Sequence, residues 1–401
     1  MADLVAHSVN PFLFGTGSWV YTQLVGLRRW RAIVVCKRRE NREDNPFDDV
    51  FALVDRPLPM QLLERLGRRL SAGTFPFMKK ALESKGARLL HSHFASQGWT
   101  DLPLARATGV PHLTSFYGAD IWKNSRDPAW RERYTGLFAA GTAFLVEGNA
   151  MRAKVESLGC PREKILVQHL GVELQNATFA ERKLPSDRRV RILASGRAVE
   201  KKGHELAVKA FARARREAPD LRLSLMIIAK SDDEKQRLER IQSLVREEGV
   251  EDAVDFPPPR SYADYRKSLY DYHVFFAPSL HAANGDAEGG APVSVIDMSA
   301  TGMPIVASRH CDIPEVAPDG VSGVLFDEGN VEQAAAALLQ VAHAPERWSA
   351  WGKAGRAHVE REYSLARQVE RLEEIYDSIT NGDSITNRDS IAGRSTGSRA
   401  P

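Results

Sequence analysis

The chain has 401 residues, of which 43% are apolar and 27% are charged. This composition is typical of a globular protein with room for two domains, and it excludes a disordered or fibrous chain. The formal net charge of +3 is too small to indicate a nucleic-acid-binding protein. No run of about 18 apolar residues indicates a membrane-spanning helix.

The first residues, MADLVAHSVNPF, lack the basic segment and apolar run of a secretion signal. The three cysteines, Cys36, Cys160 and Cys311, lie too far apart for a disulfide framework or a cysteine metal knuckle. We therefore expect a cytoplasmic protein.

Short β-branched runs alternate with segments of helical periodicity along the chain. In the first half, strands are predicted at residues 31–36, 87–94, 111–116, 142–147 and 164–169. In the second half, they are predicted at residues 191–195, 221–228, 273–279, 304–308 and 323–326. Strands that alternate with helices predict parallel sheets covered by helices on both faces. The expected fold class is therefore α/β, with two Rossmann-like doubly wound domains.

The composition also predicts where the domains end. We expect an N-terminal domain over residues 1–176, a polar linker at 177–189 and a C-terminal domain over 190–362. Residues 363–379 place their apolar side chains on one helical face and need a surface to cover. Tandem hexapeptides follow, DSITNG, DSITNR and DSIAGR, with too few apolar residues to offset their ordering entropy. Residues 380–401 are therefore expected to be a disordered tail.

Residues 59–80 combine leucines with basic side chains. The leucines of this predicted helix are Leu62, Leu63, Leu66 and Leu70, and the arginines beside them are Arg65, Arg68 and Arg69. Two interpretations remain open: a helix that covers the sheet, or a helix that lies on an anionic membrane.

The loop SGRAVEKKGHE, residues 195–205, follows a predicted strand directly. It places Arg197 and Lys202 at the carboxyl end of that strand, where open parallel sheets bind ligands. Each contact with a phosphate is worth roughly 4 kcal/mol before desolvation is subtracted. The two cations could therefore hold a diphosphate; the alternative is a solvated charged loop.

The stretch DAEGGAPVSVID, residues 286–297, contains a second candidate site. Gly289 and Gly290 are expected to leave their amides open to a ligand, and Pro292 suits the first turn of a helix over 292–301. Helix N-termini attract phosphates. The alternative is a plain turn and helix with solvated acids.

Acidic side chains flank this predicted helix start. Ser294 and Asp297 would lie one turn apart, about where a ribose would be. A carboxylate accepts two hydrogen bonds from a vicinal diol, and Glu288 could do the same for sugar hydroxyls.

The order of these motifs carries a family resemblance. GRAVEKKG, then PS, NGDAEGGAP, ATGMPIVAS and IPE closely resemble the retaining glycosyltransferases of family 4, which have the GT-B fold. The resemblance covers nearly all of residues 85–379. HSHF, FYGADI and GCPREKILVQHLGVEL are similar to N-domain segments of the branch that builds bacterial polysaccharides, including colanic-acid-type enzymes.

The resemblance implies roles for individual residues. Arg197 and Lys202 would bind the donor diphosphate, and Glu288 would contact the donor sugar. Asp297 stands where the family usually has a glutamate on the ribose, and Tyr117 stands where many relatives have a histidine at the reaction centre. The other residues implied are Gly196, Gly289, Gly290, Ala291, Pro292 and Ser294 on the donor side, Gly15 and Gly17 in a glycine-rich loop, and His93 and Asp120 in the cleft.

The implied activity is a retaining transfer of a sugar from a UDP- or GDP-type donor to a glycan or lipid-linked acceptor. No cofactor and no metal is expected, because the cations come from the protein and no Asp-x-Asp motif stands where a metal-dependent transferase needs one. The expected enzyme acts in surface polysaccharide synthesis and attaches peripherally to the inner face of the plasma membrane.

Other functions remain open. Tyr117 and Asp297 are compatible with a catalytically impaired subunit that only binds a nucleotide sugar. An epimerase, or a transferase acting on a small soluble substrate, would share the same fold. A nicotinamide oxidoreductase is disfavoured because no G-x-G-x-x-G follows a strand.

Overall fold

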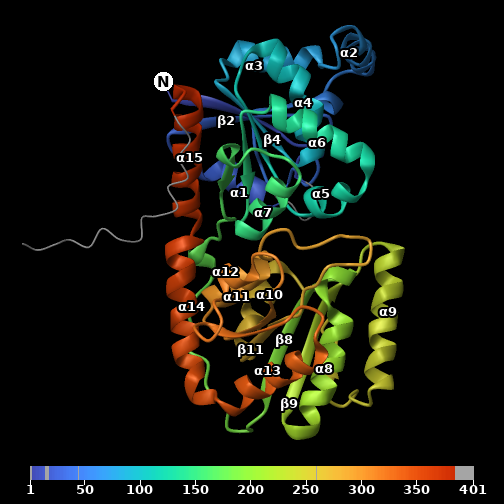
Figure 1. Ribbon diagram of the computed structural model, residues 1–401, viewed down its shortest axis with the longest axis vertical. Helices are drawn as coiled ribbons and strands as arrows, with labels where there is room; N and C mark the ends of the chain where they lie inside the picture. The colour runs from blue at the N-terminus through green and yellow to red at the C-terminus, as the bar shows by residue number, and fades with distance from the viewer. Residues whose placement is uncertain (1, 14–17, 44, 259, 384–401) are drawn as a thin grey trace, which may run out of the picture.

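Two parallel sheets lie one above the other along the long axis of the protein (Figure 1). The computed structural model describes residues 2–13, 18–43, 45–258 and 260–383. Helices flank both sheets, as expected for doubly wound domains. The fold class predicted from the sequence is therefore confirmed.

The first sheet has the strand order β3-β2-β1-β4-β5-β6-β7. Its strands are β1 (Asp3–Ser8), β2 (Trp30–Cys36), β3 (Val50–Ala52), β4 (Leu89–His93), β5 (His112–Ser115), β6 (Ala143–Val146) and β7 (Ile165–Val167). The strand order reverses direction between β1 and β4, and ligands of such sheets bind beyond the carboxyl ends of the strands at this point.

The second sheet has the order β10-β9-β8-β11-β12-β13. Its strands are β8 (Val190–Arg197), β9 (Leu221–Ile228), β10 (Val254–Asp255), β11 (Val274–Ala277), β12 (Ile305–Ser308) and β13 (Gly323–Phe326). Its order reverses between β8 and β11.

The ten strands predicted from the sequence are all present, and β1, β3 and β10 were not predicted. β10 has two residues and β3 has three, which is too short for a pattern to emerge. β1 is central, but it ends in the polar pair His7–Ser8, and both residues are fully buried. Because the last residues of β1 are polar, a prediction based on apolar runs misses this buried strand.

The helices of the first domain lie on both faces of its sheet (Figure 1). They are α1 (Ser18–Gly26), α2 (Leu58–Leu70), α3 (Pro76–Lys85), α4 (Ala95–Thr108), α5 (Ala119–Trp122), α6 (Pro128–Ala140) and α7 (Asn149–Ser157). The later helices are α8 (His204–Glu217), α9 (Asp232–Glu247), α10 (Tyr262–Ser268), α11 (Val293–Ala300), α12 (Ile313–Val316), α13 (Val331–His343), α14 (Trp348–Glu362) and α15 (Leu365–Asn381).

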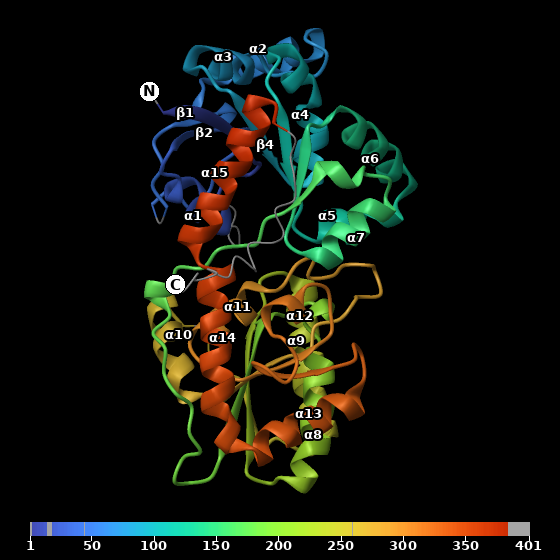
Figure 2. The ribbon, with the colours of Figure 1, turned by 60° about the vertical axis from the view of Figure 1, so that its left-hand side comes forward.

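The last two helices run in line along one side of the molecule, from the second domain to the first (Figure 2). α14 packs in the second domain through Trp348 and Trp351. α15 packs on the first sheet, where Leu372, Tyr376 and Ile379 join a buried cluster that contains strand residues of β1, β4, β5, β6 and β7. The chain therefore returns to its first domain at the end. The predicted tail falls largely on residues 384–401, which lie outside the described residues.

The predicted helix over 59–80 is two helices with different surroundings. α3 covers the sheet and buries Phe77, Met78 and Leu82. α2 buries no side chain, and its leucines Leu62 and Leu70 are 64% and 80% exposed. The sheet-covering interpretation therefore holds for α3 and fails for α2. Among the described helices, none combines the length and apolarity needed to cross a membrane.

Candidate active site

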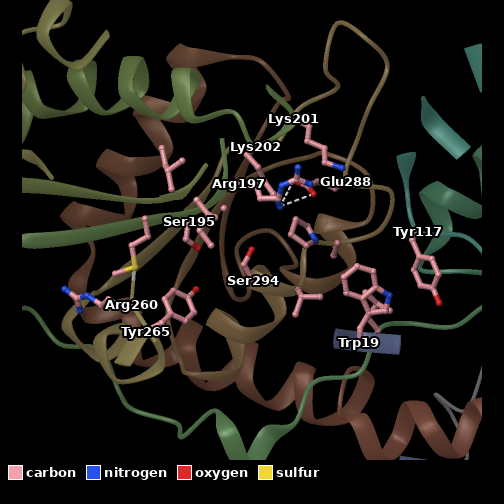
Figure 3. A pocket seen from close by; sticks show the side chains of 18 of the residues that line it. Trp19, Tyr117, Ser195, Arg197, Lys201, Lys202, Arg260, Tyr265, Glu288 and Ser294 are labelled. Carbon is pink, nitrogen blue, oxygen red and sulfur yellow. Dashed lines mark hydrogen bonds and ion pairs between the residues drawn. The ribbon is translucent and has the colours of Figure 1, made fainter. Parts of the chain in front are cut away.

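A cavity of about 620 Å³ lies between the carboxyl ends of the two sheets (Figure 3). The first domain contributes Trp19, Tyr117 and Glu147 to its lining, and the second contributes Arg197, Lys202 and Glu288. The cavity thus lies where the order of both sheets reverses, at the position where doubly wound folds bind ligands.

Lys202 and Glu288 form the central ion pair of the cavity (Figure 3). Lys202 Nζ lies 2.9 Å from Glu288 Oε1, and Ser279 Oγ donates to the same oxygen at 2.9 Å. Burial alone would raise the pKa of Glu288, but Lys202 and the neighbouring Lys201 hold it below its usual value. Glu288 therefore stays ionised, 86 residues from its cationic partner in the chain.

Arg197 continues the positive charge at the end of β8. Its Nε donates to Glu234 Oε1 at 2.8 Å, and its Nη2 contacts the same oxygen. The Glu234 side chain is 4% exposed, whereas that of Arg197 is 52% exposed. Glu234 also forms the capping box of α9 with Ser231. Arg197 is thus anchored by a buried acid and turned toward the open side of the cavity.

The two domains touch at the loop that carries Glu288. A Cβ atom at Gly289 would lie 2.3 Å from Gly118 Cα, so only glycine fits at this approach. A hydrogen bond from the Gly290 amide reaches Glu147. We expected the amides of Gly289 and Gly290 to be open to a ligand; instead, the Gly289 amide hydrogen-bonds Cys311 of the second domain and the Gly290 amide hydrogen-bonds Glu147 of the first.

The start of α11 does reach the cavity. Ala291, Pro292 and Ser294 line it, with Pro292 preceding the first helical residue. Asp297 lies one turn further and is not among the lining residues. Its carboxylate Oδ1 lies 3.3 Å from Arg266 Nη1. In this structure, Asp297 therefore pairs with a cation beside the cavity.

Gly196 leaves room for the cationic side chain that reaches Glu288. A Cβ atom at this position would lie 3.1 Å from Lys202 Cδ. Gly196 itself is one of the lining residues. A side chain at this position would crowd Lys202, which would have to shift by a few tenths of an ångström.

Tyr117 turns its hydroxyl away from the Lys202–Glu288 pair (Figure 3) and into the first domain. There, Tyr117 Oη lies 2.6 Å from His93 Nδ1, and His93 Nε2 lies 2.9 Å from His7 Nδ1. The His93 side chain is fully buried and does not line the cavity. In this structure, His93 acts on the cavity only through Tyr117.

The hydrogen bonds continue through α15 and return to Tyr117. His7 Nε2 lies 3.5 Å from Tyr376 Oη, which lies 2.8 Å from His91 Nδ1. His91 Nε2 lies 2.7 Å from Ser115 Oγ, and the Ser115 side chain hydrogen-bonds Tyr117. We call this closed network the histidine ring; its members are Tyr117, His93, His7, Tyr376, His91 and Ser115.

The histidine ring closes only if its imidazoles are neutral, because each member then donates one hydrogen bond and accepts one. Burial lowers the pKa of His7 to about 3 and holds the pKa values of His91 and His93 well below their usual range. Burial also raises the pKa of Tyr117. The first-domain wall of the cavity is therefore backed by uncharged groups.

Asp120 fixes the loop that carries Tyr117. Its carboxylate accepts hydrogen bonds from the amides of Tyr117 and Ala95, each at 3.0 Å. Burial raises the pKa of Asp120 to about 6. The side chain does not line the cavity, so Asp120 shapes the cleft without reaching it.

Comparison with known proteins gives the family. Residues 14–176 match the model of Glycosyltransferase Family 4, and residues 176–358 match that of Glycosyl transferases group 1. The amylovoran biosynthesis glycosyltransferase AmsK of Erwinia amylovora is 30% identical over 291 residues, which cover 73% of this chain and 70% of AmsK. The chain belongs to glycosyltransferase family 4.

Other relatives extend the match over more of this glycosyltransferase. The D-inositol 3-phosphate glycosyltransferase of Segniliparus rotundus is 26% identical over 386 residues, which cover 90% of this chain and 83% of that protein. The structure of Anabaena HepE in complex with UDP superposes with a TM-score of 0.75 and 15% identity. This superposition covers 94% of this chain and 100% of HepE, and it shows the GT-B fold.

Several lining residues of the glycosyltransferase were not predicted. Glu147 follows β6 directly and Arg197 is the last residue of β8, so the place of Glu147 at a strand end was a usable signal. Burial, together with Asp312 and Asp120, raises the pKa of Glu147 well above its usual value. Trp19, Arg260 and Tyr265 also line the cavity. Gly15 and Gly17 lie outside the described residues, so their predicted role remains a prediction.

Proposed function

We propose that this glycosyltransferase transfers a sugar, with retention of anomeric configuration, from a nucleoside-diphosphate sugar to a glycan or lipid-linked acceptor. The observation that carries this proposal is the pair of cations, Arg197 and Lys202, at the end of β8 in a cavity walled by both domains. The GT-B neighbour HepE has been solved with UDP and with UDP-glucose, which supports a donor of this type.

The ion pairs suggest how the donor enters. Each cation is held by a glutamate that a diphosphate could replace, since phosphate oxygens accept the same hydrogen bonds. Lys202 would then turn toward the diphosphate and release Glu288 Oε2, which Lys202 Nζ contacts at 3.0 Å. Glu288 would become free to accept hydrogen bonds from the donor sugar. Donor binding would thus free the Glu288 carboxylate for the sugar in the same step.

The transfer step would take place on one face of the sugar. The bond between the anomeric carbon and the diphosphate oxygen breaks, and its electron pair moves to that oxygen. The acceptor oxygen attacks the same face, and its proton moves to the departing diphosphate. Arg197 and Lys202 would stabilise the negative charge that grows on the diphosphate. A preorganised hydrogen-bond donor at such a position contributes about 10²–10³-fold to the rate. No step requires a metal ion.

A ligand panel tests the donor. Thermal unfolding is measured with UDP, GDP, ADP and NAD, for the wild type and for Glu288→Gln and Arg197→Ala. A ligand at about 100 times its dissociation constant stabilises the folded state by roughly 2.7 kcal/mol. We expect one nucleoside diphosphate to stabilise the wild type and to do so less in Arg197→Ala. If no nucleotide shifts the transition, the proposed donor site is wrong.

Product analysis separates the remaining alternatives. A transferase releases nucleoside diphosphate from the donor only with an acceptor present, and the anomeric proton of the product retains the donor's configuration by NMR. A binding subunit would be stabilised by the nucleotide yet release none. An epimerase would convert the donor without any acceptor.

The acceptor proposal is supported by α2. The relative AmsK is named for amylovoran biosynthesis. The exposed leucines of α2 include Leu62, Leu63 and Leu66, while Arg65 and Arg69 are exposed on the same helix. An apolar face flanked by arginines binds anionic lipid surfaces, and each basic residue contributes about 1 kcal/mol. We therefore propose that α2 lies on the inner face of the plasma membrane.

Vesicle sedimentation tests this surface. The double variant Leu62→Ser/Leu66→Ser is expected to lose binding to anionic vesicles, because a buried leucine side chain contributes roughly 1.5–3 kcal/mol. The control is Val321→Ser, a 54% exposed apolar residue of the second domain. Equal binding by the wild type and the double variant, or none by the wild type at low salt, would remove α2 from the proposal.

A further inference from the structure

Within the part of the chain that the structure describes, two groups of side chains bring potential metal ligands together. They differ in exposure, because the first group is fully buried and the second contains the exposed His281. The first is His7, His91 and His93, whose ligand atoms lie within 4.8 Å of one another. Every ring nitrogen of these three residues has a partner in the histidine ring. This group is therefore satisfied without an ion.

The second group joins two loops: His281 lies on the loop that carries Glu288, between β11 and α11, whereas His310 and Cys311 follow β12. One ring nitrogen each from His281 and His310 lies within 4.8 Å of the other and of Cys311 Sγ. His310 Nε2 is 3.2 Å from Cys311 Sγ. These three residues combine two imidazoles and one thiol, the ligand types that Zn²⁺ prefers in proteins.

Glu328 orients both histidines of this group. His281 Nδ1 lies 2.9 Å from Glu328 Oε1, and His310 Nδ1 lies 2.8 Å from Glu328 Oε2. A carboxylate on Nδ1 keeps the proton there and makes Nε2 the accepting nitrogen, which is how zinc-binding histidines are commonly held. In His310, this nitrogen accepts from the Glu288 amide at 3.2 Å, a hydrogen bond that a metal ion would replace.

We propose that His281, His310 and Cys311 form a binding site for Zn²⁺, with Glu328 as the carboxylate that orients the two histidines. The fourth ligand would be water. The His281 side chain is 41% exposed, which gives the ion a path into the site. Binding would replace the thiol proton of Cys311 with the metal and release that proton to solvent. Ligand atoms in a tetrahedral zinc site lie about 3.3–3.8 Å apart, given bond lengths near 2.0–2.3 Å, so the exposed His281 would move inward.

Zinc at this site would change the contacts of the loop that carries Glu288. The Glu288 amide donates to His310 Nε2 at 3.2 Å, and a hydrogen bond from the Gly289 amide reaches Cys311. A metal on these two atoms takes both acceptors from the loop. Zinc would therefore inhibit sugar transfer from outside the cavity. This inhibitory effect rests on the proposed function, whereas zinc binding itself does not.

Calorimetry and cobalt substitution test the site. We expect the full chain to bind one Zn²⁺, and Co²⁺ to give a thiolate-to-metal absorption band; Mg²⁺ should give neither signal. Cys311→Ser should abolish the band, and Glu328→Gln should raise the dissociation constant about 10–100-fold. The matched control is His343→Ala, which removes an exposed histidine outside the group. Melting curves confirm that each variant folds.

Two results would overturn the proposal: equal zinc affinity in the wild type and Cys311→Ser, or no cobalt–thiolate band in the wild type. For inhibition, Zn²⁺ should lower kcat/KM of the wild type at least tenfold, with His281→Ala needing at least tenfold more zinc. Basal activity of His281→Ala should match the wild type. If zinc binds but no nucleotide stabilises the protein, the metal site stands and the proposed transferase function fails.

Discussion

The two walls of the cavity differ in chemistry. The second-domain wall is charged, with Arg197 and Lys202 each held by a glutamate that is almost fully buried. The first-domain wall is backed by neutral groups: Tyr117 belongs to a closed ring of hydroxyls and imidazoles that burial keeps uncharged. The acid of this wall, Glu147, has a pKa that burial raises well above its usual value. One wall therefore holds its charges in ion pairs, whereas the other is backed by neutral hydrogen bonds.

This difference teaches what each wall can exchange with a ligand. An ion pair can be opened by an anion, because the incoming charge replaces the one that leaves. A closed ring of neutral hydrogen bonds gains nothing by opening, because every donor and acceptor is already satisfied. Under the proposed function, the cations of the second domain would exchange their glutamate partners for the diphosphate, whereas the hydrogen bonds of the first domain would stay unchanged.

The largest effect should come from removing a charge of the second-domain wall. Lys202→Ala is expected to lower the rate of sugar transfer about 10²–10³-fold, as loss of a preorganised donor does in other enzymes. The comparison variant is Lys201→Ala, because Lys201 also lines the cavity but pairs with Asp286 at 3.2 Å rather than with Glu288. Initial rates with saturating donor measure both. Similar rates for the two variants would show that the charge paired with Glu288 has no special role in transfer.

Opening the neutral ring should cost stability. Tyr376→Phe removes the hydroxyl that joins His7 to His91 and leaves buried nitrogens without a partner, which costs about 1–3 kcal/mol. Tyr363→Phe is the control, because Tyr363 is also buried but packs beside His169 outside the ring. Urea denaturation compares the two. Equal unfolding free energies would show that the ring is not closed in solution.

The pH dependence of stability sharpens the same contrast. The pKa of His7 is about 3 in the folded protein, below the ordinary value of 6.5, so the unfolded chain binds the extra proton. Its stabilising contribution is present above pH 6.5 and is lost as the pH falls. The free energy of unfolding of the wild type, relative to that of His7→Gln, should therefore fall by about 1.4 kcal/mol for each pH unit between roughly pH 6 and 4.

The quantity to measure is the difference in unfolding free energy between the wild type and His7→Gln at each pH. Buried acids such as Asp101, Asp120 and Asp312 have raised pKa values and shift stability in the opposite direction, but they do so in both proteins. An advantage that stays constant with pH would mean that His7 is protonated in the folded state or exposed.

The smallest effect on stability should come from Arg197. Its side chain is half exposed, and an exposed ion pair contributes at most about 1 kcal/mol. Arg197→Ala should therefore unfold within that margin of the wild type while binding the nucleoside diphosphate at least tenfold more weakly, by calorimetry. Loss of stability without loss of binding would place Arg197 among the structural residues.

The sequence was most informative where a signal is local. Strand runs and the loops at their ends predicted both sheets, and they pointed to Arg197, Lys202 and Glu288, which the structure brings to one cavity. The direction of the Tyr117 hydroxyl and the pairing of Asp297 could not be read in this way. Both depend on partners from elements distant in the chain.

The same limit explains the missed residues. Glu234 lies 37 residues from Arg197, and His7 lies 86 residues from His93. No periodicity or spacing links such pairs, because they meet only when strands and helices pack. Local patterns predict which residues stand at a strand end; the three-dimensional packing decides which of them face each other.

The return of α15 to the first domain has a consequence for protein synthesis. Tyr376 follows His7 by 369 residues, yet its hydroxyl completes the ring in the domain made first. At about 5–20 residues per second, a ribosome needs roughly 20–75 s to add that many residues. During this time, the nascent first domain lacks the helix that covers one side of its sheet. Ribosome-bound chains arrested before residue 365 should therefore be cleaved by a protease in the first domain. The completed, released protein should resist cleavage at the same positions.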